Sequence, residues 1–517
     1  MSLDAVGLEV MGHAFASVAE EMGLVLIHSA VSPNIRERRD CSAALFDAAG
    51  EMIAQAAHIP VHLGALHESV AAVRALSPAP GEVFILNDPY AGGSHLPDIT
   101  LVGAVEVDGA VGGYGVVRAH HSDVGGMQAG SMPAGARDIF AEGVVVPPLL
   151  LTPEVERFLL ANVRTPEARR ADLAAQRAAM ERGADDLRAL AARHGWAVLR
   201  EAARDLQAYA ERRARQALAR LETTGLTATD WLEGDGVDDR DLAIQVRVDI
   251  RDGVFHADFT GTAPAARGNV NCPLAVARSA VLFVVRTLLP EDVPTNGGVT
   301  RVVRVTAPEG CLVHARFPSA VAAGNVETSQ RIADTVFLAL ANAGLSVPAQ
   351  GQGTMNNVTF GGIGVRGSGL EAGWTYYETI GGGQGASPGA HGPSGVHVGM
   401  SNTRNTPIEV LEMEYPLRIR SYGVRQGSGG AGKWTGGAGV TREFEALAPM
   451  DASFLSERRR HAPCGAGGGG AGAPGRTLVN GVPLPPKVST PLAPGDVVRI
   501  ETPGGGGWGQ PEPGGER

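Results

Sequence analysis

The strongest constraint on this chain is a β-hairpin signal centred on Asp108 and Gly109. Residues 99–121, ITLVGAVEVDGAVGGYGVVRAHH, place β-rich runs on both sides of this pair, and Asp-Gly favours a two-residue hairpin turn. If the pair forms the turn, His120 faces Pro97 and lies beside the preceding HLPD segment. Glycines that could insert a β-bulge and shift this register by one or two residues follow the turn: Gly112, Gly113 and Gly115.

The hairpin brings three candidate metal ligands together. His95 and Asp98 are three residues apart, and Pro97 keeps Leu96 extended, so this pair lies in a loop or at the start of a strand. His120 returns beside them on the second arm. Imidazole and carboxylate ligands together suit Zn²⁺, Mn²⁺ or Fe²⁺, and three protein ligands leave a coordination position for water or substrate. We therefore predict a divalent metal site at His95, Asp98 and His120.

A second histidine, His121, follows His120 directly. Adjacent residues of a regular strand point to opposite faces of the sheet, so we expect only one of the two to bind the metal. His121 and Asp123 are then expected to move a proton or to orient a ligand, and both are candidate catalytic residues. The alternative interpretation of these histidines is a set of surface or hydrogen-bonded side chains.

Two nearby segments offer further polar candidates. His58 and His62, in HIPVHLG, could join the site, and His62 is the candidate substrate contact. The alternative for both is a hydrogen-bonded loop histidine. Asp40, in ERRDCSAALFD, is a candidate catalytic base, and its alternative is an ion pair with Arg38 or Arg39 at the entry to a strand.

A glycine-rich segment later in the chain is a candidate substrate pocket. Residues 376–392, YYETIGGGQGASPGAHG, combine a carboxylate with a turn whose backbone N–H groups could approach a substrate. Tyr377, Glu378 and Gln384 are the candidate substrate-binding residues. The alternative is a tight β-turn that places Tyr376 and Tyr377 in the core.

A second glycine-rich segment, GSGGAGKWTGG, resembles a phosphate-binding loop only in part. Gly427, Gly432 and Lys433 have Walker A spacing, but Trp434 stands where Ser or Thr should hold Mg²⁺, and no helical pattern follows. We interpret this segment as a glycine-rich turn that packs around Trp434. Two further runs, GAGGGGAGAPG and TPGGGGWG, are interpreted as turns or flexible loops.

Length and local pattern predict a multi-domain α+β protein. A chain of 517 residues exceeds one ordinary core, and about two to four domains are expected. The predicted regions are a mixed α/β region with the metal site (1–152), a helical hairpin or bundle (153–228), a mixed α/β region (229–350) and a glycine-rich β region (351–517). The elements expected within them are a helix in 1–30, a strand pair in 41–56, a hairpin turning at Asp252-Gly253, and buried helices in 274–289 and 327–344. Breaks in the helical region are expected near Pro166, Gly183 and Gly195.

Composition excludes several classes of protein. The net charge of −11 disfavours nucleic acid as a partner, because phosphate binding needs a basic surface. No run of eighteen apolar residues is present, so no membrane span is expected. Acidic residues in the first twenty positions argue against a signal peptide and favour the cytoplasm. The four cysteines are far apart and form no CxxC pair, which fits neither a disulfide framework nor a zinc ribbon.

Taken in order, these segments resemble the hydantoinase B/oxoprolinase family. The resemblance covers nearly the whole chain and rests on NIRERRDCSAALFD, HIPVHLGALHESV, NDPYAGGSHLPDIT, AHHSDVGG, NVRTP with ADLAAQ, GNVN, YYETIGGGQGA, NTRNTPIEVLEMEYPLRI, RQGSGGAGKWTGGAG and TPGGGGWG. The family includes B subunits of hydantoinases and caprolactamases, the C-terminal part of 5-oxoprolinase, and subunits of acetone and acetophenone carboxylases.

The resemblance implies a division of labour between two chains. A partner A subunit with an actin-like ATP-binding fold phosphorylates the substrate carbonyl oxygen, and the B-type chain acts on the activated intermediate. Family members carry a metal held by residues that correspond to His95, Asp98 and His120. The implied activity is ATP-dependent ring opening of a hydantoin, a lactam or 5-oxoproline, within a cytoplasmic hetero-oligomer. ATP would be bound by the partner, not by this chain.

Two departures from the family pattern and two alternative functions remain. Many relatives carry an aromatic residue where this chain has Gln384, which could change the substrate pocket, and ARRADLAAQ lacks the usual glycine before its Asp-Leu. One alternative function is a subunit of a biotin-independent ketone carboxylase, although the chain is shorter than acetone carboxylase subunits of this type. The other is a non-catalytic scaffold for the A subunit.

Overall fold

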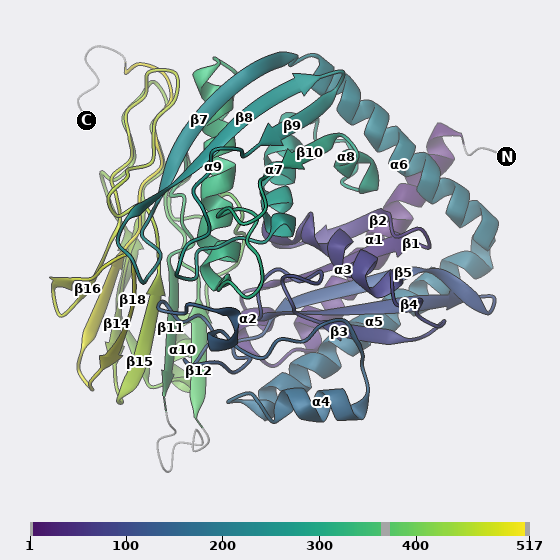
Figure 1. Ribbon diagram of the computed structural model, residues 1–517, viewed down its shortest axis with the longest axis horizontal. Helices are drawn as coiled ribbons and strands as arrows, with labels where there is room; N and C mark the ends of the chain where they lie inside the picture. The colour runs from purple at the N-terminus through teal and green to yellow at the C-terminus, as the bar shows by residue number, and fades with distance from the viewer. Residues whose placement is uncertain (1–3, 363–372, 512–517) are drawn as a thin grey trace.

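The computed structural model describes residues 4–362 and 373–511, and within them helices and four β-sheets form an α+β architecture (Figure 1). The N-terminal sheet lies at the lower right of Figure 1 and the C-terminal strands at the left, with helices α7 (Leu274–Leu288) and α9 (Ser329–Asn342) in the middle. The predicted fold class is confirmed. The division into four regions stays a prediction, and its limit at residue 228 falls inside strand β7 (Thr223–Glu233).

The six-stranded N-terminal sheet carries the segments that form the candidate metal site. Its strands run in the order β2-β1-β5-β4-β3-β6. Their bounds are Cys41–Asp47 (β1), Met52–Ala57 (β2), Val83–Leu86 (β3), Asp98–Val107 (β4), Ala110–His120 (β5) and Leu149–Leu150 (β6). One face packs against α1 (Ala5–Ser29) and α5 (Pro166–His194), and the other packs against α3 (Ala65–Arg74). The helix expected in 1–30 and the strand pair expected in 41–56 are both present.

The hairpin of β4 and β5 forms as predicted, with its register shifted by one residue. Asp108 and Gly109 have φ values of 52° and 78°, as a turn with two positive φ angles requires. Pairing starts at Val107 opposite Ala110, shifts between Val105 and Glu106, and ends with Asp98 opposite His120. The shift is the bulge that the glycines after the turn allow. It places Asp98 and His120 directly across from each other.

The helical region consists of α4 (Pro153–Leu160), α5 and α6 (Trp196–Ala219). Pro166 begins α5, and Gly195, with φ of 85°, separates α5 from α6. The break expected near Gly183 is wrong, because α5 continues through it. A Cβ atom on Gly183 would lie 2.4 Å from Met22 Sδ, so the glycine allows α1 to approach α5 closely.

Helix α1 is long and apolar enough to cross a membrane by length and composition alone. In this fold, 44% of its most apolar window is buried. Its buried side chains, among them Phe15 and Met22, join the core shared by α5 and the N-terminal sheet. One face of the helix therefore packs into this core.

A four-stranded sheet in the order β10-β9-β8-β7 packs against α7 and α9. The strands β8 (Asp241–Arg251) and β9 (Val254–Asp258) turn at Asp252 and Gly253, with φ of 52° and 66°, so the second predicted hairpin is confirmed. The remaining elements of this part are β10 (Val303–Thr306), α8 (Gly297–Thr300) and the π-helix η3 (Gly324–Thr328). The buried helices expected in 274–289 and 327–344 correspond to α7 and α9.

Two further sheets form the C-terminal part, in the orders β12-β11-β15-β18 and β13-β14-β19-β16-β17. The bounds of the first are Asn357–Gly362 (β11), Trp374–Glu378 (β12), Met450–Leu455 (β15) and Lys487–Leu492 (β18). Those of the second are Leu417–Val424 (β13), Val440–Ala446 (β14), Arg476–Val479 (β16), Val482–Pro483 (β17) and Val497–Glu501 (β19). The two sheets share one apolar core, and a short helix, α10 (Ile408–Glu414), adds Leu411 to it. Shorter helical turns elsewhere in the chain are α2 (Pro33–Arg36), η1 (Pro60–His62) and η2 (Ile139–Ala141).

The glycine-rich runs of the C-terminal part form a packed layer rather than flexible loops. Backbone hydrogen bonds join Gly505 N to Gly437 O at 2.9 Å, Gly437 N to Gln384 O at 2.8 Å, and Gly507 N to Gly470 O at 2.9 Å. A Cβ atom on many of these glycines would meet neighbouring backbone at about 2 Å. The interpretation of GAGGGGAGAPG and TPGGGGWG as flexible loops is corrected accordingly, although a turn does form at Gly467 and Gly468. No helix follows Lys433, and Trp434 pairs with Trp508 in this layer.

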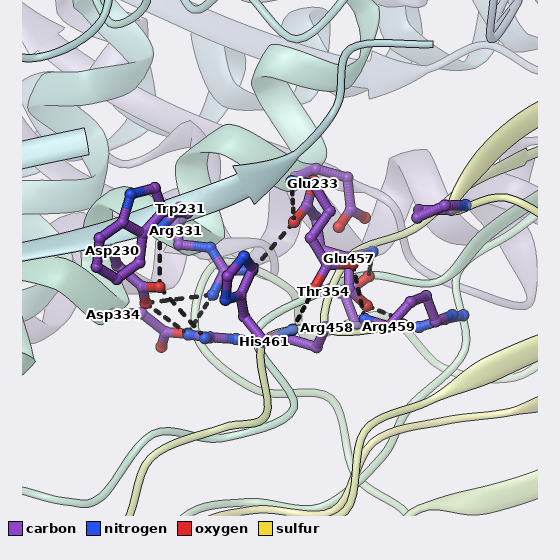
Figure 2. Close-up of polar contacts among 12 residues, drawn as sticks. Asp230, Trp231, Glu233, Arg331, Asp334, Thr354, Glu457, Arg458, Arg459 and His461 are labelled. Carbon is purple, nitrogen blue, oxygen red and sulfur yellow. Dashed lines mark hydrogen bonds and ion pairs between the residues drawn. The ribbon is translucent and has the colours of Figure 1, made fainter. Parts of the chain in front are cut away.

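A buried ion-pair network ties β7, α9 and the chain after β15 together (Figure 2). Asp230 Oδ2 accepts from Arg331 Nη1 at 3.2 Å and from Arg458 Nη2 at 2.8 Å. Arg458 Nη2 also reaches Asp334 Oδ2 at 2.6 Å, and Arg331 Nη2 reaches Glu457 Oε2 at 3.2 Å. These contacts link residues more than one hundred positions apart in the sequence. The network therefore joins the middle third and the last third of the chain through one buried cluster of charged side chains.

Candidate metal centre

The candidate metal ligands lie where the first and last residues of two paired strands meet. Asp98 begins β4 and His120 ends β5, so the strand register places them opposite each other. His95 lies in the turn before β4, and its carbonyl accepts the backbone N–H of Asp98 at 3.0 Å. The tight turn therefore brings the side chain of His95 back over Asp98.

The three side chains converge on one point. His95 Nε2 lies 3.0 Å from Asp98 Oδ1, and His120 Nδ1 lies 3.1 Å from the same oxygen. One ligand atom from each residue falls within 4.8 Å of the others. His95, Asp98 and His120 are 0%, 1% and 2% exposed. The residues that the sequence predicts as metal ligands thus form a buried cluster that could hold one ion; we call it the triad.

Two ring nitrogens of the triad make no hydrogen bond among the described residues: Nε2 of His120, and Nε2 of His95, which lies 3.0 Å from Asp98 Oδ1 without forming a hydrogen bond. Buried polar atoms are almost always paired, so unpartnered ones need an explanation. His95 Nδ1 is used on its other side, 3.3 Å from the carbonyl oxygen of Ala322. That contact fixes the ring and leaves Nε2 turned toward Asp98, which is how a histidine ligand is usually held.

The second oxygen of Asp98 is held by three neighbours. Ser94 Oγ donates to Asp98 Oδ2 at 2.7 Å, His62 Nε2 lies 3.3 Å from it, and Asn325 Nδ2 lies 3.4 Å from it. Burial alone would raise the pKa of Asp98, but His95, with His120 and His62, holds it well below its usual value. Asp98 is therefore a carboxylate, which is the form that binds a metal ion.

Burial lowers the pKa of His120 below its ordinary value of 6.5, although Asp98 opposes this shift. The neutral ring is the form that binds metal. Its plane is set by Tyr377, whose ring stacks on it with centroids 4.5 Å apart and an interplanar angle of 18°. A carboxylate and imidazoles that share a buried point fit Zn²⁺, Mn²⁺ or Fe²⁺ by donor type.

A cavity of about 20 Å³ opens beside the triad. Such a volume holds one ion or one water molecule, so a ring-sized substrate requires its lining to move. Besides the triad, its walls include Asp40, His62, Tyr377 and Asn325. Asp40 forms no ion pair with Arg38 or Arg39 in the part of the chain that the structure describes. Its backbone carbonyl accepts the N–H of His120 at 3.0 Å, which seats it next to the triad.

Of the other candidate residues, three lie beside the triad and a fourth, His58, does not. His62, Tyr377 and Asp40 line the cavity, and His62 Nδ1 is also 2.9 Å from Ser42 Oγ. His58 does not line it. Its Nε2 would lie 2.8 Å from a Cβ atom placed on Gly23, so its ring packs against α1.

The structure does not bring His121 and Asp123 to the cavity. His121 points to the opposite side of the sheet, as adjacent strand residues must, and its Nε2 lies 2.9 Å from Gln176 Oε1 on α5. Burial lowers its pKa to about 4. Asp123 is tied to Arg164 Nη1 at 3.0 Å and to the backbone N–H groups of Gly125 and Gly130. Both side chains are thus occupied in holding α5 and a loop.

Glu378 and Gln384 also lie away from the triad. Glu378 is on the opposite face of β12 from Tyr377, and its carboxylate binds Arg442 Nη1 at 2.7 Å and the hydroxyl of Tyr376 at 2.7 Å. Gln384 belongs to the glycine layer, where its backbone groups are bonded to Pro393 and Gly437. The backbone N–H groups that were expected to face a substrate are used within that layer.

Asn325 is one of two side chains at Asp98, with Ser94, that the sequence does not single out. It lies in η3, a π-helical turn, and such turns occur frequently at functional sites. The available signal was Gly324, where a Cβ atom would lie 1.8 Å from the carbonyl oxygen of Asn271. A glycine required by such a close approach fixes Asn325 beside Asp98.

Comparisons with known proteins agree with this geometry. A family model described as Hydantoinase B/oxoprolinase matches residues 4–511. The chain is 38% identical over 526 residues to an uncharacterized protein of Methanocaldococcus jannaschii, covering 98% of this chain and 91% of that one. It is 36% identical over 545 residues to 5-oxoprolinase 1 of Arabidopsis thaliana, covering 98% of this chain and 42% of that one. The chain belongs to the hydantoinase B/oxoprolinase family.

Two further similar proteins are bacterial. A protein of a Pseudomonas species, described as the putative B-type chain of a D-/L-hydantoinase, is 30% identical over 541 residues, with 98% of this chain and 90% of that one covered. The ATP-dependent caprolactamase of Pseudomonas jessenii superposes with a TM-score of 0.89 at 28% identity, over 99% of this chain and 92% of that one. Acetone carboxylase, at 17% identity and a TM-score of 0.85 over 98% of this chain and 75% of that one, shares the fold. The chain spans about two fifths of the length of several 5-oxoprolinases that it matches, 41% and 42%.

Proposed function

We propose that this chain is the B-type subunit of an ATP-dependent cyclic amidohydrolase that opens a hydantoin, a lactam or 5-oxoproline. The observation that carries the proposal is the buried triad of His95, Asp98 and His120, in which two ring nitrogens make no hydrogen bond among the described residues. Family membership and the names of the relatives support a substrate with a cyclic amide. The partner is a hydantoinase A-type chain, supported by a relative whose name makes it the B-type chain of a hydantoinase.

The proposed reaction divides between the two chains because an amide is a poor electrophile. The partner uses ATP to phosphorylate the carbonyl oxygen, which makes the ring carbon open to attack. Water then adds to that carbon, the C–N bond breaks with a proton passing to nitrogen, and hydrolysis of the acyl phosphate releases phosphate. The B-type chain is the site of water addition.

The residues around the cavity have distinct roles in this proposal. Asp98, His95 and His120 would hold a divalent ion, which would supply positive charge beside the phosphorylated carbon–oxygen group and would lower the pKa of a water molecule. Asp40 accepts the proton of the attacking water, because it is the carboxylate outside the triad that lines the cavity. His62 holds the second oxygen of Asp98, and Tyr377 holds the plane of His120.

Reconstitution with the A-type partner tests the proposal. ATP hydrolysis and ring opening are measured on hydantoins, lactams and 5-oxoproline, with ketones and bicarbonate included. The proposal expects ring opening that depends on both chains and on ATP, with no bicarbonate consumed. Stoichiometric use of bicarbonate would instead identify a carboxylase. Full turnover by His95→Ala and Asp98→Ala complexes would identify a scaffold.

Asp40→Asn is the sharper test of the proton acceptor. The substitution keeps the size of the side chain and removes its basicity, so kcat falls while metal content stays at the wild-type level. Asp123→Asn is the matched control, because Asp123 is the other aspartate that the sequence predicts as catalytic and it lies away from the cavity. An Asp40→Asn complex with wild-type kcat would remove Asp40 from the mechanism.

A further inference from the structure

Two glutamates are buried behind the triad without lining its cavity. Glu142 and Glu327 are both 0% exposed, and each is linked through other groups to one histidine of the triad. We propose that Glu142 and Glu327 are positioning residues that hold His95 and His120 in the orientation that binds a divalent ion. The inference rests on the proposed metal centre and extends it beyond the residues that touch the ion.

The first link runs from Glu142 to His95 through the backbone. Glu142 Oε1 accepts the N–H of Val321 at 2.9 Å and that of Ala322 at 2.8 Å. The carbonyl oxygen of Ala322 in turn lies 3.3 Å from His95 Nδ1. Glu142 thereby fixes the short segment whose carbonyl occupies Nδ1, and Nε2 is left facing Asp98.

The second link runs from Glu327 to His120 through two side chains. Glu327 Oε1 accepts from Asn357 Nδ2 at 2.7 Å, and Asn357 Oδ1 accepts from the hydroxyl of Tyr377 at 2.8 Å. The ring of Tyr377 stacks on His120. Because the hydroxyl donates to one end of the amide and the other end donates to Glu327, each bond fixes the direction of the next. The amide of Asn357, in the middle of this series of hydrogen bonds, is poorly suited to relay protons. The series therefore serves to position the ring of Tyr377.

Both carboxyl groups are costly to bury, which argues that they are kept for a purpose. Neither forms an ion pair within residues 4–362 and 373–511. Burial raises the pKa of Glu142 to about 8 and that of Glu327 to about 7. Groups that orient a metal ligand from behind typically change metal affinity by about 10-fold to 100-fold when they are removed.

Co²⁺ binding by the whole chain is the test. Affinity is measured by competition with a chelator, and the visible absorption of bound Co²⁺ reports the geometry of its ligands. Glu142→Ala and Glu327→Ala are each expected to weaken Co²⁺ binding by about 10-fold to 100-fold and to alter the spectrum. Glu142→Gln and Glu327→Gln keep an oxygen at the Oε1 position, so both are expected to restore affinity and spectrum toward wild type.

Glu233 provides a matched control that does not line the triad's cavity, and Figure 2 shows it beside the buried ion-pair network. It is 1% exposed, and its carboxylate accepts the backbone N–H groups of Arg459, Arg460 and His461 at 2.8, 2.8 and 2.7 Å. Glu233→Ala therefore removes a similar set of bonds. It is expected to lower stability and to leave Co²⁺ affinity and spectrum unchanged.

Adjacent tyrosines provide a second matched pair. Tyr376 and Tyr377 are both 1% exposed, and each hydroxyl donates to one buried acceptor, Glu378 at 2.7 Å and Asn357 at 2.8 Å. Tyr377→Phe cuts the link to Glu327 and is expected to weaken Co²⁺ binding. Tyr376→Phe is expected to leave binding unchanged, because its hydroxyl lies on the other face of β12.

The outcomes separate this inference from the proposed function. Wild-type affinity and spectrum in folded Glu142→Ala and Glu327→Ala, together with loss of binding in Asp98→Ala, would overturn the inference and leave the metal centre standing. A wild-type chain that binds no ion would overturn both. If an alanine variant does not fold, Glu142→Asp or Glu327→Asp, one methylene shorter, gives the same test.

Discussion

The triad and the ion-pair network are both buried clusters of charged groups, but their partners differ. In the network, Asp230 faces the guanidinium groups of Arg331 and Arg458 (Figure 2). In the triad, Asp98 faces imidazole rings instead. Each carboxylate has a pKa held below its usual value by its neighbours, although burial opposes the shift in both.

The two clusters differ in the chemistry of their nitrogen atoms that make no hydrogen bond, and this difference decides what each cluster can bind. Within the described part of the chain, the Nε atoms of Arg331 and Arg458 make no hydrogen bond, and neither do the Nε2 atoms of His95 and His120. A guanidinium nitrogen has no lone pair to offer and always carries its share of positive charge. An imidazole nitrogen can offer a lone pair to a cation. The network is therefore suited to holding segments together, and the triad is suited to binding an ion.

The largest expected effect is on activity, from His120→Ala. Loss of a metal ligand is expected to lower ring opening by the complex about 10³-fold or more, because a metal supplies several kcal/mol of transition-state stabilisation. Thermal stability should also fall, because the change removes a buried ring that stacks on Tyr377 and bonds to Asp98. Steady-state kinetics and a melting curve check both. A folded variant with wild-type turnover would make the triad a structural cluster like the network.

Arg331→Ala is expected to lower stability without lowering metal content. Removing one partner of a buried ion pair leaves carboxylates uncompensated and costs about 3–5 kcal/mol of stability. Metal content of the folded protein should be unchanged. Denaturant unfolding and metal analysis measure the two quantities. Arg460→Ala is the control, because its pairs with Asp239 and Asp241 are exposed and are expected to contribute less than about 1 kcal/mol.

The pH dependence of stability should separate two kinds of buried carboxyl group. Arg458 and Arg331 hold the pKa of Asp230 below its ordinary 3.8 despite its burial, so its contribution is present above that pH and is lost as pH falls further. Burial raises the pKa of Glu142 from 4.5 to about 8, so its contribution is present below pH 4.5 and is lost as pH rises toward 8.

Two substitutions test these two parts of the pH dependence of the unfolding free energy separately. Asp230→Asn should flatten the acid limb of the unfolding free energy, and Glu142→Gln should flatten the decline between pH 4.5 and 8. Denaturant titrations over a range of pH measure both slopes. Parallel profiles for the wild type and both variants would show that neither group titrates as assigned.

The sequence was enough to predict the triad because the triad depends on the pairing of two strands that are adjacent in the sequence. The Asp-Gly turn sets the pairing of β4 and β5, and that pairing alone brings His120 to Asp98. The one-residue shift was within the range that the following glycines allowed. The α+β class also follows from local periodicity.

Residues that depend on distant packing could not be placed in this way. Nothing in the run 376–392 indicates that Glu378 binds Arg442 or that Gln384 packs against Gly437. Asn325 reaches Asp98 across more than two hundred positions. Gly183 looks like a helix break, yet it is a contact point for α1. In each case the deciding partner is remote in the sequence.

Metal content is the most direct test of the central claim that His95, Asp98 and His120 hold a catalytic divalent ion. Elemental analysis is applied to the wild-type complex and to the Asp98→Ala complex, and ring-opening activity is assayed on the same preparations. We predict about one ion per B-type chain in the wild type, and loss of both the ion and the activity in the variant. A fully active preparation that contains no metal would contradict the account.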